Sequence, residues 1–238
     1  MIELEKLLHL EGAVLWLPCT LLLFAASSWL YRRLNKAPVA NPTLLTIAAL
    51  VVMLVGVGVP YKTYFESVAI IHYLLGTAVV ALALPLYRNV GRLKGRRMGM
   101  AVALVAGSLT SILVGLSVAI LAHASASTVL SLAPKSATAA VSMEISRIIG
   151  GAPAVTATLT ILTGIIGAIA GPYVLNILRV LDPEARGFAM GVASHGIATA
   201  RAFIEGEVAG SFAGLGMVLN AILTALVVPP VVRLMGYG

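Results

Sequence analysis

Long runs without Asp, Glu, Lys or Arg are the feature of this sequence that most constrains its fold. Runs of at least 20 such residues lie at 12–31, 42–61, 67–87, 98–134, 148–178 and 208–232. A helix needs about 20 apolar residues to cross the hydrocarbon core of a bilayer. The longer runs must hold a span and part of a further element. The pattern predicts an all-α polytopic membrane protein with about seven or eight transmembrane segments.

Composition supports this class. Hydrophobic residues make up 60% of the chain and charged residues 11%, whereas soluble domains average about 25% charged residues. Half of the Lys and Arg residues fall in two loops between hydrophobic runs, namely Arg32, Arg33 and Lys36, then Arg88, Arg92, Lys94, Arg96 and Arg97. Such clustering is the positive-inside pattern, so both loops are predicted to be cytoplasmic. The net charge of +7 therefore does not indicate nucleic-acid binding.

Two hydrophobic stretches carry polar groups that a lipid-facing helix would lack. Gly187–Glu207 contains an uncharged run of only 14 residues, too short for a simple span, and glycines such as Gly191 and Gly196 punctuate it. Ser131–Gly151 is similar in kind and contains a candidate helix break at Pro134. Polar groups in a membrane usually face one another or a cavity. These two stretches are therefore interpreted as the working parts, with interrupted or re-entrant helices.

A weak internal repeat suggests how the spans are arranged. LLGTAVVALALPLY, ending at Tyr87, aligns with ILTGIIGAIAGPYV, ending at Val174, and pairs Pro85 with Pro172. Three spans per copy is an odd number, so the second copy would be inverted in the membrane, as in many secondary transporters. The predicted organisation is a single membrane domain: 1–37 first span and basic loop, 38–125 first repeat, 126–207 second repeat, and 208–238 last span.

Lys135 is the first candidate for anion binding. On a helix, Lys135, Thr138 and Ser142 would share one face. An ammonium group beside a helix N-terminus is a natural carboxylate site. The alternative is a lysine whose amine reaches the membrane interface.

Arg201 and His195 are the candidates in the other stretch. Arg201 could bind a carboxylate with two hydrogen bonds, or it could pair with Glu205 one turn later. His195 shares a helix face with Thr199 and could donate to a substrate or carry a proton. The alternative is a buried histidine that bonds a backbone carbonyl.

Glu144 and Arg147 are the remaining candidate residues in Ser131–Gly151. Glu144 and Arg147 are predicted to form a structural pair, with proton coupling through Glu144 as the lesser possibility. The sequence contains no metal-ligand spacing, phosphate loop or nucleophile with a base, so neither a metal nor enzyme activity is expected. No cofactor is expected either.

Several ordered motifs resemble the LrgB/CidB family. They are Pro134-Lys-Ser136, Glu144-Ile-Ser146, Ile149-Gly-Gly-Ala-Pro-Ala154 and Ala193-Ser-His-Gly-Ile-Ala-Thr-Ala-Arg-Ala202. The resemblance covers nearly the whole chain. It implies a multi-pass protein of the bacterial cytoplasmic membrane, described either as an antiholin-like or holin-like modulator of murein hydrolases or as a relative of the plastid glycolate/glycerate translocator.

The leading expectation is a secondary transporter of small monocarboxylates or hydroxycarboxylates, of the glycolate, glycerate or pyruvate class. The alternative is the holin-like or antiholin-like role in lysis. The expected partners are a carboxylate anion, membrane lipids, a small holin-like protein and a second copy of the chain in a dimer. The predicted substrate-binding residues are Lys135, Ser136, Thr138, Ser194, His195, Thr199 and Arg201.

Overall fold

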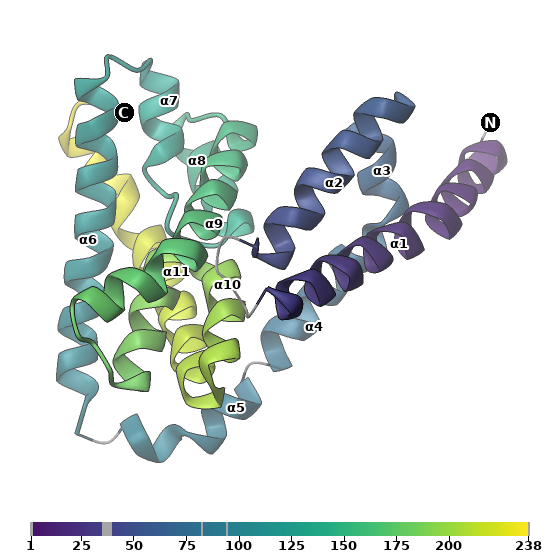
Figure 1. Cartoon of the computed structure of the whole chain (residues 1–238). Coiled ribbons are helices and arrows are strands. Elements are labelled where there is room, and N and C mark those ends of the chain that lie inside the picture. The colour runs from purple at the N-terminus through teal and green to yellow at the C-terminus, as the bar shows by residue number, and fades with distance from the viewer. Residues whose placement is uncertain (1, 35–39, 82, 94, 238) are drawn as a thin grey trace. The chain divides into compact units, whose positions relative to one another are not determined.

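The computed structural model describes residues 2–34, 40–81, 83–93 and 95–237, and all regular structure in these ranges is helical. The chain divides into two compact units, 1–81 and 82–238. The division falls inside the predicted first repeat, and the repeat itself stays a prediction. Figure 1 shows the helices of both units.

The N-terminal unit is a small helical hairpin closed by a bent element. Its helices are α1 (Ile2–Arg33), α2 (Pro42–Val57), α3 (Tyr61–Ser67) and α4 (Ala69–Ala81). α2 begins where the Asn41 side chain accepts the backbone N–H groups of Thr43 and Leu44, which satisfies two of the free donors at a helix start. The chain then bends by 119° between α2 and α3.

Aromatic packing stabilises this hairpin. Trp16 of α1 packs edge-on against Tyr64 of α3, with 5.9 Å between the ring centroids. The Tyr64 hydroxyl also lies 3.0 Å from the hydroxyl of Thr20. Leu54 and Val68 complete the buried cluster. The bend is therefore fixed by a buried core rather than left open.

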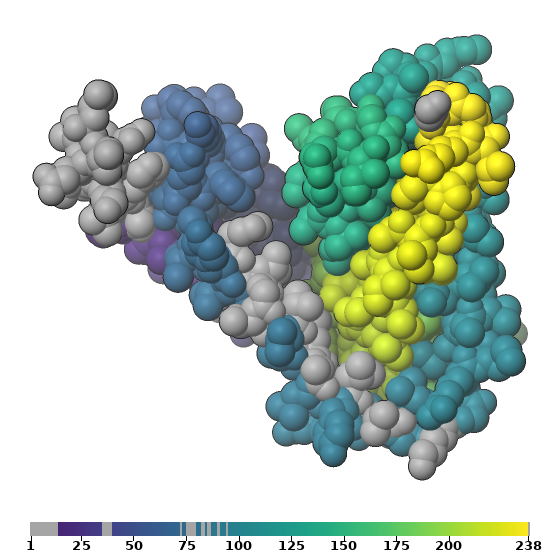
Figure 2. All heavy atoms as spheres, turned by 180° about the vertical axis from the view of Figure 1, so that it is seen from behind, coloured from purple at the N-terminus to yellow at the C-terminus, as the bar shows by residue number. Residues whose placement is uncertain are grey.

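The C-terminal unit is a larger helical bundle. Its elements are α5 (Ala83–Arg88), η2 (Val90–Leu93), α6 (Arg97–Leu121), α7 (Ala126–Leu132), α8 (Ala139–Ile149), α9 (Pro153–Ile177), α10 (Pro183–Glu205) and α11 (Glu207–Leu234). α6 runs along one edge of the bundle in Figure 1, and Figure 2 shows α11, in yellow, along the face seen from behind.

Backbone contact between α10 and α11 forms the centre of this bundle. Gly187 and Gly191 lie one turn apart on α10, facing Ala209 and Ala213 of α11. A Cβ atom at Gly187 would lie 1.9 Å from the Ala209 carbonyl oxygen, and one at Gly191 would lie 2.0 Å from the Ala213 carbonyl oxygen. Small residues four apart allow membrane helices to approach this closely.

Among the residues that the structure describes, four helices are long and apolar enough to cross a membrane, or five if the bent α2–α3 pair counts as one span. They are Val14–Arg33, Arg97–Leu121, Pro153–Ile177 and Glu207–Leu234. This is fewer than the seven or eight expected, because the run at 67–87 is shared among short helices and α10 carries several charges. The protein is nevertheless a multi-pass membrane protein.

Candidate functional site

α10 is interrupted at Ser194 and His195, within the stretch where the sequence predicts a break. Ser194 has φ −147° and ψ 25°, and His195 has φ 43° and ψ −137°, neither of which is helical. The helices on either side continue through the glycines suggested as break points, Gly191 and Gly196. The interruption is therefore at the polar residues themselves.

The interrupted segment packs against two glycines of α9. A Cβ atom at Gly167 would lie 1.7 Å from the Ser194 Oγ, and one at Gly164 would lie 2.6 Å from the His195 ring. The His195 Nε2 lies 2.8 Å from the backbone carbonyl oxygen of Thr160. This contact matches the alternative role given above for His195, that of a buried histidine that bonds a backbone carbonyl. Thr199 donates its hydroxyl to the His195 carbonyl oxygen at 2.8 Å.

A second irregular segment connects α7 to α8 and contains Pro134 and Lys135. Ser142 donates its hydroxyl to the Pro134 carbonyl oxygen at 2.7 Å. Asn220 of α11 donates its side-chain amide to the Ser136 carbonyl oxygen at 2.9 Å. The Pro134 carbonyl oxygen also accepts the backbone N–H of Ala137 at 3.0 Å, whereas the bond from Asn220 supplies a donor to a backbone acceptor outside any helix. These hydrogen bonds fix the segment from which the Lys135 side chain extends.

Lys135 reaches α6 and lines a cavity of about 820 Å³. Its Nζ donates to the Oγ of Ser111 at 3.0 Å. A Cβ atom at Gly115 would lie 3.1 Å from the Lys135 Cε, so the alkyl chain of the lysine lies over this glycine. The lining residues come mainly from α6 and α10: Gly95, Arg96, Gly99, Met100, Ala103, Gly107, Ser111, Lys135, Glu184, Ala185, Phe188, Ala189, Val192, Ala193 and Phe212.

Small residues on α6 make room for the cavity. Gly99, Ala103, Gly107 and Ser111 all line it, and their spacing of four places them along one face of the helix. α6 advances about 1.5 Å per residue, so Arg96 and Ser111 are separated by roughly 22 Å along the helix. The cavity is therefore elongated, with Arg96 near one end and Lys135 near the other.

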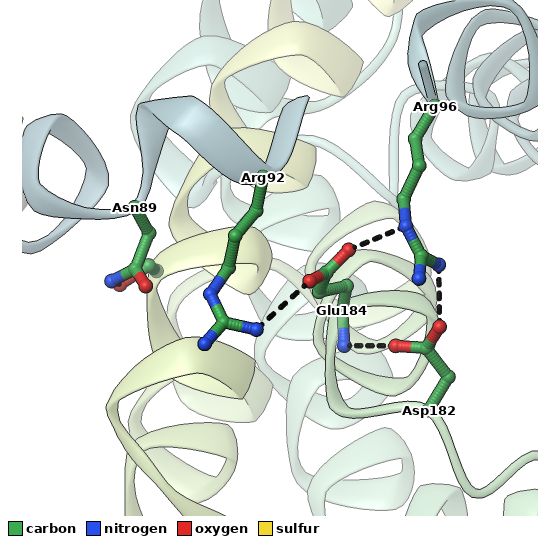
Figure 3. A network of polar contacts seen from close by, with 6 residues as sticks. Asn89, Arg92, Arg96, Asp182 and Glu184 are labelled. Carbon is green, nitrogen blue, oxygen red and sulfur yellow. Dashed lines mark hydrogen bonds and ion pairs between the residues drawn. The ribbon is translucent and has the colours of Figure 1, made fainter. Parts of the chain in front are cut away.

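An ionic network lies at the Arg96 end of the cavity (Figure 3). Arg96 contacts Glu184 of α10, with 2.8 Å between Nε and Oε2, and it also pairs with Asp182. Arg92 approaches the other carboxylate oxygen of Glu184 at 3.3 Å. Asp182 caps α10 by accepting the Glu184 backbone N–H at 2.9 Å. The hydrogen bond from Arg96 holds the pKa of the Asp182 carboxyl below its ordinary value.

The predicted site residues do not all meet at this cavity. Lys135 lines it, whereas His195 and Arg201 are not among its lining residues, so the expected convergence of these three side chains does not occur there. The remaining predicted residues lie elsewhere in the bundle. Ser136, Ser194, His195 and Thr199 are buried, Thr138 is the N-cap residue of α8, and Arg201 is partly buried.

The predicted structural pair of Glu144 and Arg147 is present on the surface of α8. Two hydrogen bonds join the side chains, at 3.0 and 2.6 Å, and they lower the pKa of the Glu144 carboxyl. Glu205 accepts from Arg186, with 2.9 Å between Oε2 and Nε. Arg186 also donates to the carbonyl oxygen of Val180 at 3.0 Å, which ties α10 to the loop that follows α9.

Sequence reasoning missed the polar residues at the Arg96 end and Ser111. Arg92 and Arg96 were interpreted only as topology signals. One signal was available: Asp182 and Glu184 are two of only nine acidic residues in the chain, and they flank a proline that begins a helix. Within the described ranges, no group of three or more His, Cys, Asp or Glu side chains could hold a metal ion.

Comparison with known proteins identifies the family. The LrgB-like family profile matches residues 20–234, which is nearly the entire sequence. This chain belongs to the LrgB-like family. The family expected from the motifs is thereby confirmed.

Named relatives of this LrgB-like chain align over most of their length. A holin-like protein CidB of Staphylococcus epidermidis is 33% identical over 223 residues, covering 93% of this chain and 96% of the relative. The uncharacterized protein YwbG of Bacillus subtilis is 34% identical over 210 residues, covering 88% of this chain and 93% of the relative. A holin-like protein CidB of Staphylococcus aureus is 32% identical over 198 residues, covering 83% and 86%. No solved structure matches the LrgB-like chain.

Proposed function

We propose that this chain acts as a holin-like protein of a bacterial cytoplasmic membrane and modulates murein hydrolase activity and lysis. The observation that carries this proposal is the similarity to a holin-like CidB protein over 93% of this chain and 96% of the relative. Similarity of that extent leaves no large part of either protein without a counterpart. The helical, multi-pass architecture is compatible with a role exercised within the bilayer.

This role is tested in a bacterium whose own LrgB-like genes have been deleted. Cells that express the chain should differ from cells with an empty vector in their rate of autolysis and in the murein hydrolase activity of their culture fluid. Membrane fractions are blotted to verify insertion. Equal autolysis and equal hydrolase activity in the two strains, with the protein present in the membrane, would overturn the proposal.

The cavity favours a second function, the transport of small monocarboxylates or hydroxycarboxylates of the glycolate, glycerate or pyruvate class. Its charged lining residues are Arg96, Lys135 and Glu184, which gives a formal charge of two positive minus one negative, or +1. A low-dielectric cavity with an excess positive charge attracts anions. Lys135 donates to a neutral hydroxyl, so an anion at this end would supply the missing negative charge.

Purified protein in lipid vesicles separates the two functions. The carrier function predicts uptake of labelled glycolate or pyruvate that saturates with concentration, whereas the holin-like function does not require it. Lys135→Met should reduce the uptake by at least about tenfold. Vesicles that retain their contents and take up no labelled carboxylate would overturn the carrier function and leave the holin-like proposal to the autolysis assay.

We also propose an inverted repeat within the chain and two protein partners for it. The three-span inverted repeat, with copies at 38–125 and 126–207, would produce additional short or broken crossings beyond the four or five long helices. A separate small holin-like protein and a second copy of this chain are the proposed partners. Crosslinking in native membranes, followed by mass spectrometry, tests both partners.

A further inference from the structure

We propose that Arg96 is the entrance site for anions into the cavity, and that Glu184 and Asp182 occupy it when no anion is present. This inference rests on the carrier function proposed above, because it assigns the residue that first receives the carboxylate. An incoming carboxylate would replace the Glu184 carboxylate on Arg96, and it would then move along α6 towards Lys135. No covalent step is involved.

The position of Arg96 supports this role. Arg96 and Glu184 both line the cavity, and the Arg96 side chain is 51% exposed, so the guanidinium is accessible from outside. The Glu184 side chain is only 9% exposed. A guanidinium presents a planar set of donors that fits a carboxylate with two parallel hydrogen bonds. The protein's own carboxylates therefore occupy the groups that a carboxylate ligand requires.

Arg92 lowers the free-energy cost of exchanging the Glu184 carboxylate on Arg96 for an incoming anion. A buried carboxylate without a partner is strongly unfavourable, and Glu184 would become one if Arg96 were its only cation. Arg92 approaches Glu184 Oε1 at 3.3 Å and is not among the residues that line the cavity. When Arg96 turns to an incoming anion, Arg92 can keep the charge of Glu184 compensated. The network thus contains one arginine for the entrance and one that stays with the glutamate.

The opposing interpretation is that the network only fastens η2 and the start of α6 to α10. In that case its charges would contribute to folding, but they would not control which small ions reach the cavity. The two interpretations differ in the effect that Glu184→Gln should have on the entry of anions into the cavity. A purely structural network should be weakened by this change, whereas an entrance blocked by Glu184 should accept anions more readily.

Thiol accessibility measures the entrance without requiring transport. Cys19 is the only cysteine, so Cys19→Ala provides a background into which Ala189→Cys is introduced. Ala189 lines the cavity on α10. The full-length protein in detergent is treated with a negatively charged sulfonatoethyl methanethiosulfonate or a positively charged trimethylammonioethyl methanethiosulfonate, and the ratio of the two rates is compared with that of a small free thiol.

The anionic reagent should be favoured by roughly fivefold over the free-thiol ratio, the size of effect expected from one net charge at partial screening. Arg96→Gln should remove this preference, and Glu184→Gln should increase it. A misfolded variant cannot produce the increase. Arg147→Gln is the matched control, because it removes an arginine from an exposed ion pair on α8, and it should leave the ratio unchanged.

Protection by glycolate tests the exchange itself. Glycolate should slow the anionic reagent at Ala189→Cys, and half-protection should need several-fold less glycolate in Glu184→Gln. An unchanged reagent ratio in Arg96→Gln, a lower ratio in Glu184→Gln, or equal glycolate protection with and without Glu184 would each overturn the proposal. If these measurements turn out as expected but vesicles take up no carboxylate, the anion entrance stands and the carrier function falls.

Discussion

The Nζ of Lys135 donates a hydrogen bond to the Oγ of Ser111 at 3.0 Å, and this contact places a cation at the inner end of the cavity. The hydroxyl of Ser111 satisfies one donor but supplies no negative charge. The acidic residue among those lining the cavity, Glu184, lies towards the Arg96 end. Lys135 is therefore suited to attract an anion rather than to neutralise a carboxylate of its own chain.

Gly115→Ala should displace Lys135 without removing its charge. The added Cβ would lie 3.1 Å from the Lys135 Cε, so the alkyl chain must move and the bond to Ser111 should weaken. We expect the apparent affinity for glycolate to fall several-fold in vesicle uptake. Gly56→Ala in α2 is the control, since nothing lies within 4 Å of its added Cβ. Equal affinities in both variants would contradict the placement of Lys135.

Substitutions of His195 should reverse the usual order of alanine and glycine in a helix. Alanine is normally favoured by about 1 kcal/mol. At position 195, however, the φ of 43° with a ψ of −137° is a sparsely populated conformation that penalises a residue with a Cβ atom by roughly 1–3 kcal/mol. Both substitutions lose the contact with the Thr160 carbonyl oxygen. His195→Gly should therefore unfold at a higher temperature than His195→Ala in detergent. The opposite order would show that the break in α10 does not require this conformation.

Gly191→Ala should disrupt the packing of α10 on α11, whereas Gly196→Ala should be tolerated. The first adds a methyl group 2.0 Å from the Ala213 carbonyl oxygen, and the second meets nothing nearer than the Met217 sulfur at 3.9 Å. Since backbone cannot give way as a side chain does, Gly191→Ala should destabilise the protein by about 3 kcal/mol. Thermal unfolding of the two variants tests this: Gly191→Ala should unfold at a clearly lower temperature than Gly196→Ala, and equal unfolding temperatures would contradict the close packing of α10 on α11.

Some of these features could be predicted from the sequence because they are local. The lengths of the uncharged runs indicate a membrane protein, the polar residues of Gly187–Glu207 mark the interrupted helix, and the spacing of Glu144 and Arg147 predicts their pair. Each depends on residues within a few turns of one another. Sequence periodicity shows which residues share a face of one helix.

The cavity could not be predicted in this way, because its contacts join distant helices. Arg96 pairs with Asp182, 86 positions away, and Lys135, in the connection between α7 and α8, bonds Ser111 of α6. Periodicity does not say which helix packs against which face. The small residues of α6 are as compatible with close helix packing as with a cavity, so their pattern does not predict a cavity. We expected Lys135, His195 and Arg201 to meet because we assumed that the polar residues of the two stretches share one site. Lys135 lines this cavity, whereas His195 and Arg201 are not among its lining residues.

The contribution of Asp182 to stability should depend on pH in one direction. Its folded pKa lies below the ordinary value, with the hydrogen bond from Arg96 as the main cause. The stabilisation is therefore fully present above the unfolded pKa of about 3.9, and it is lost as the pH falls through the folded value. The difference in unfolding temperature between the wild type and Asp182→Asn should be constant from about pH 7 to pH 5 and vanish in stronger acid. A difference that disappears at neutral pH would contradict this assignment.

The central claim of the proposed carrier function is that Lys135 makes the cavity between α6 and α10 a path for small anions, and uptake of labelled glycolate by vesicles containing the purified protein tests it most directly. Loss of one charge-assisted hydrogen bond is worth roughly 1.5–3 kcal/mol, so Lys135→Met should reduce uptake by at least about tenfold. Arg147→Gln, which removes an exposed arginine that does not line this cavity, should transport as the wild type does. Equal uptake by Lys135→Met and the wild type, with equal amounts of inserted protein, would contradict the claim.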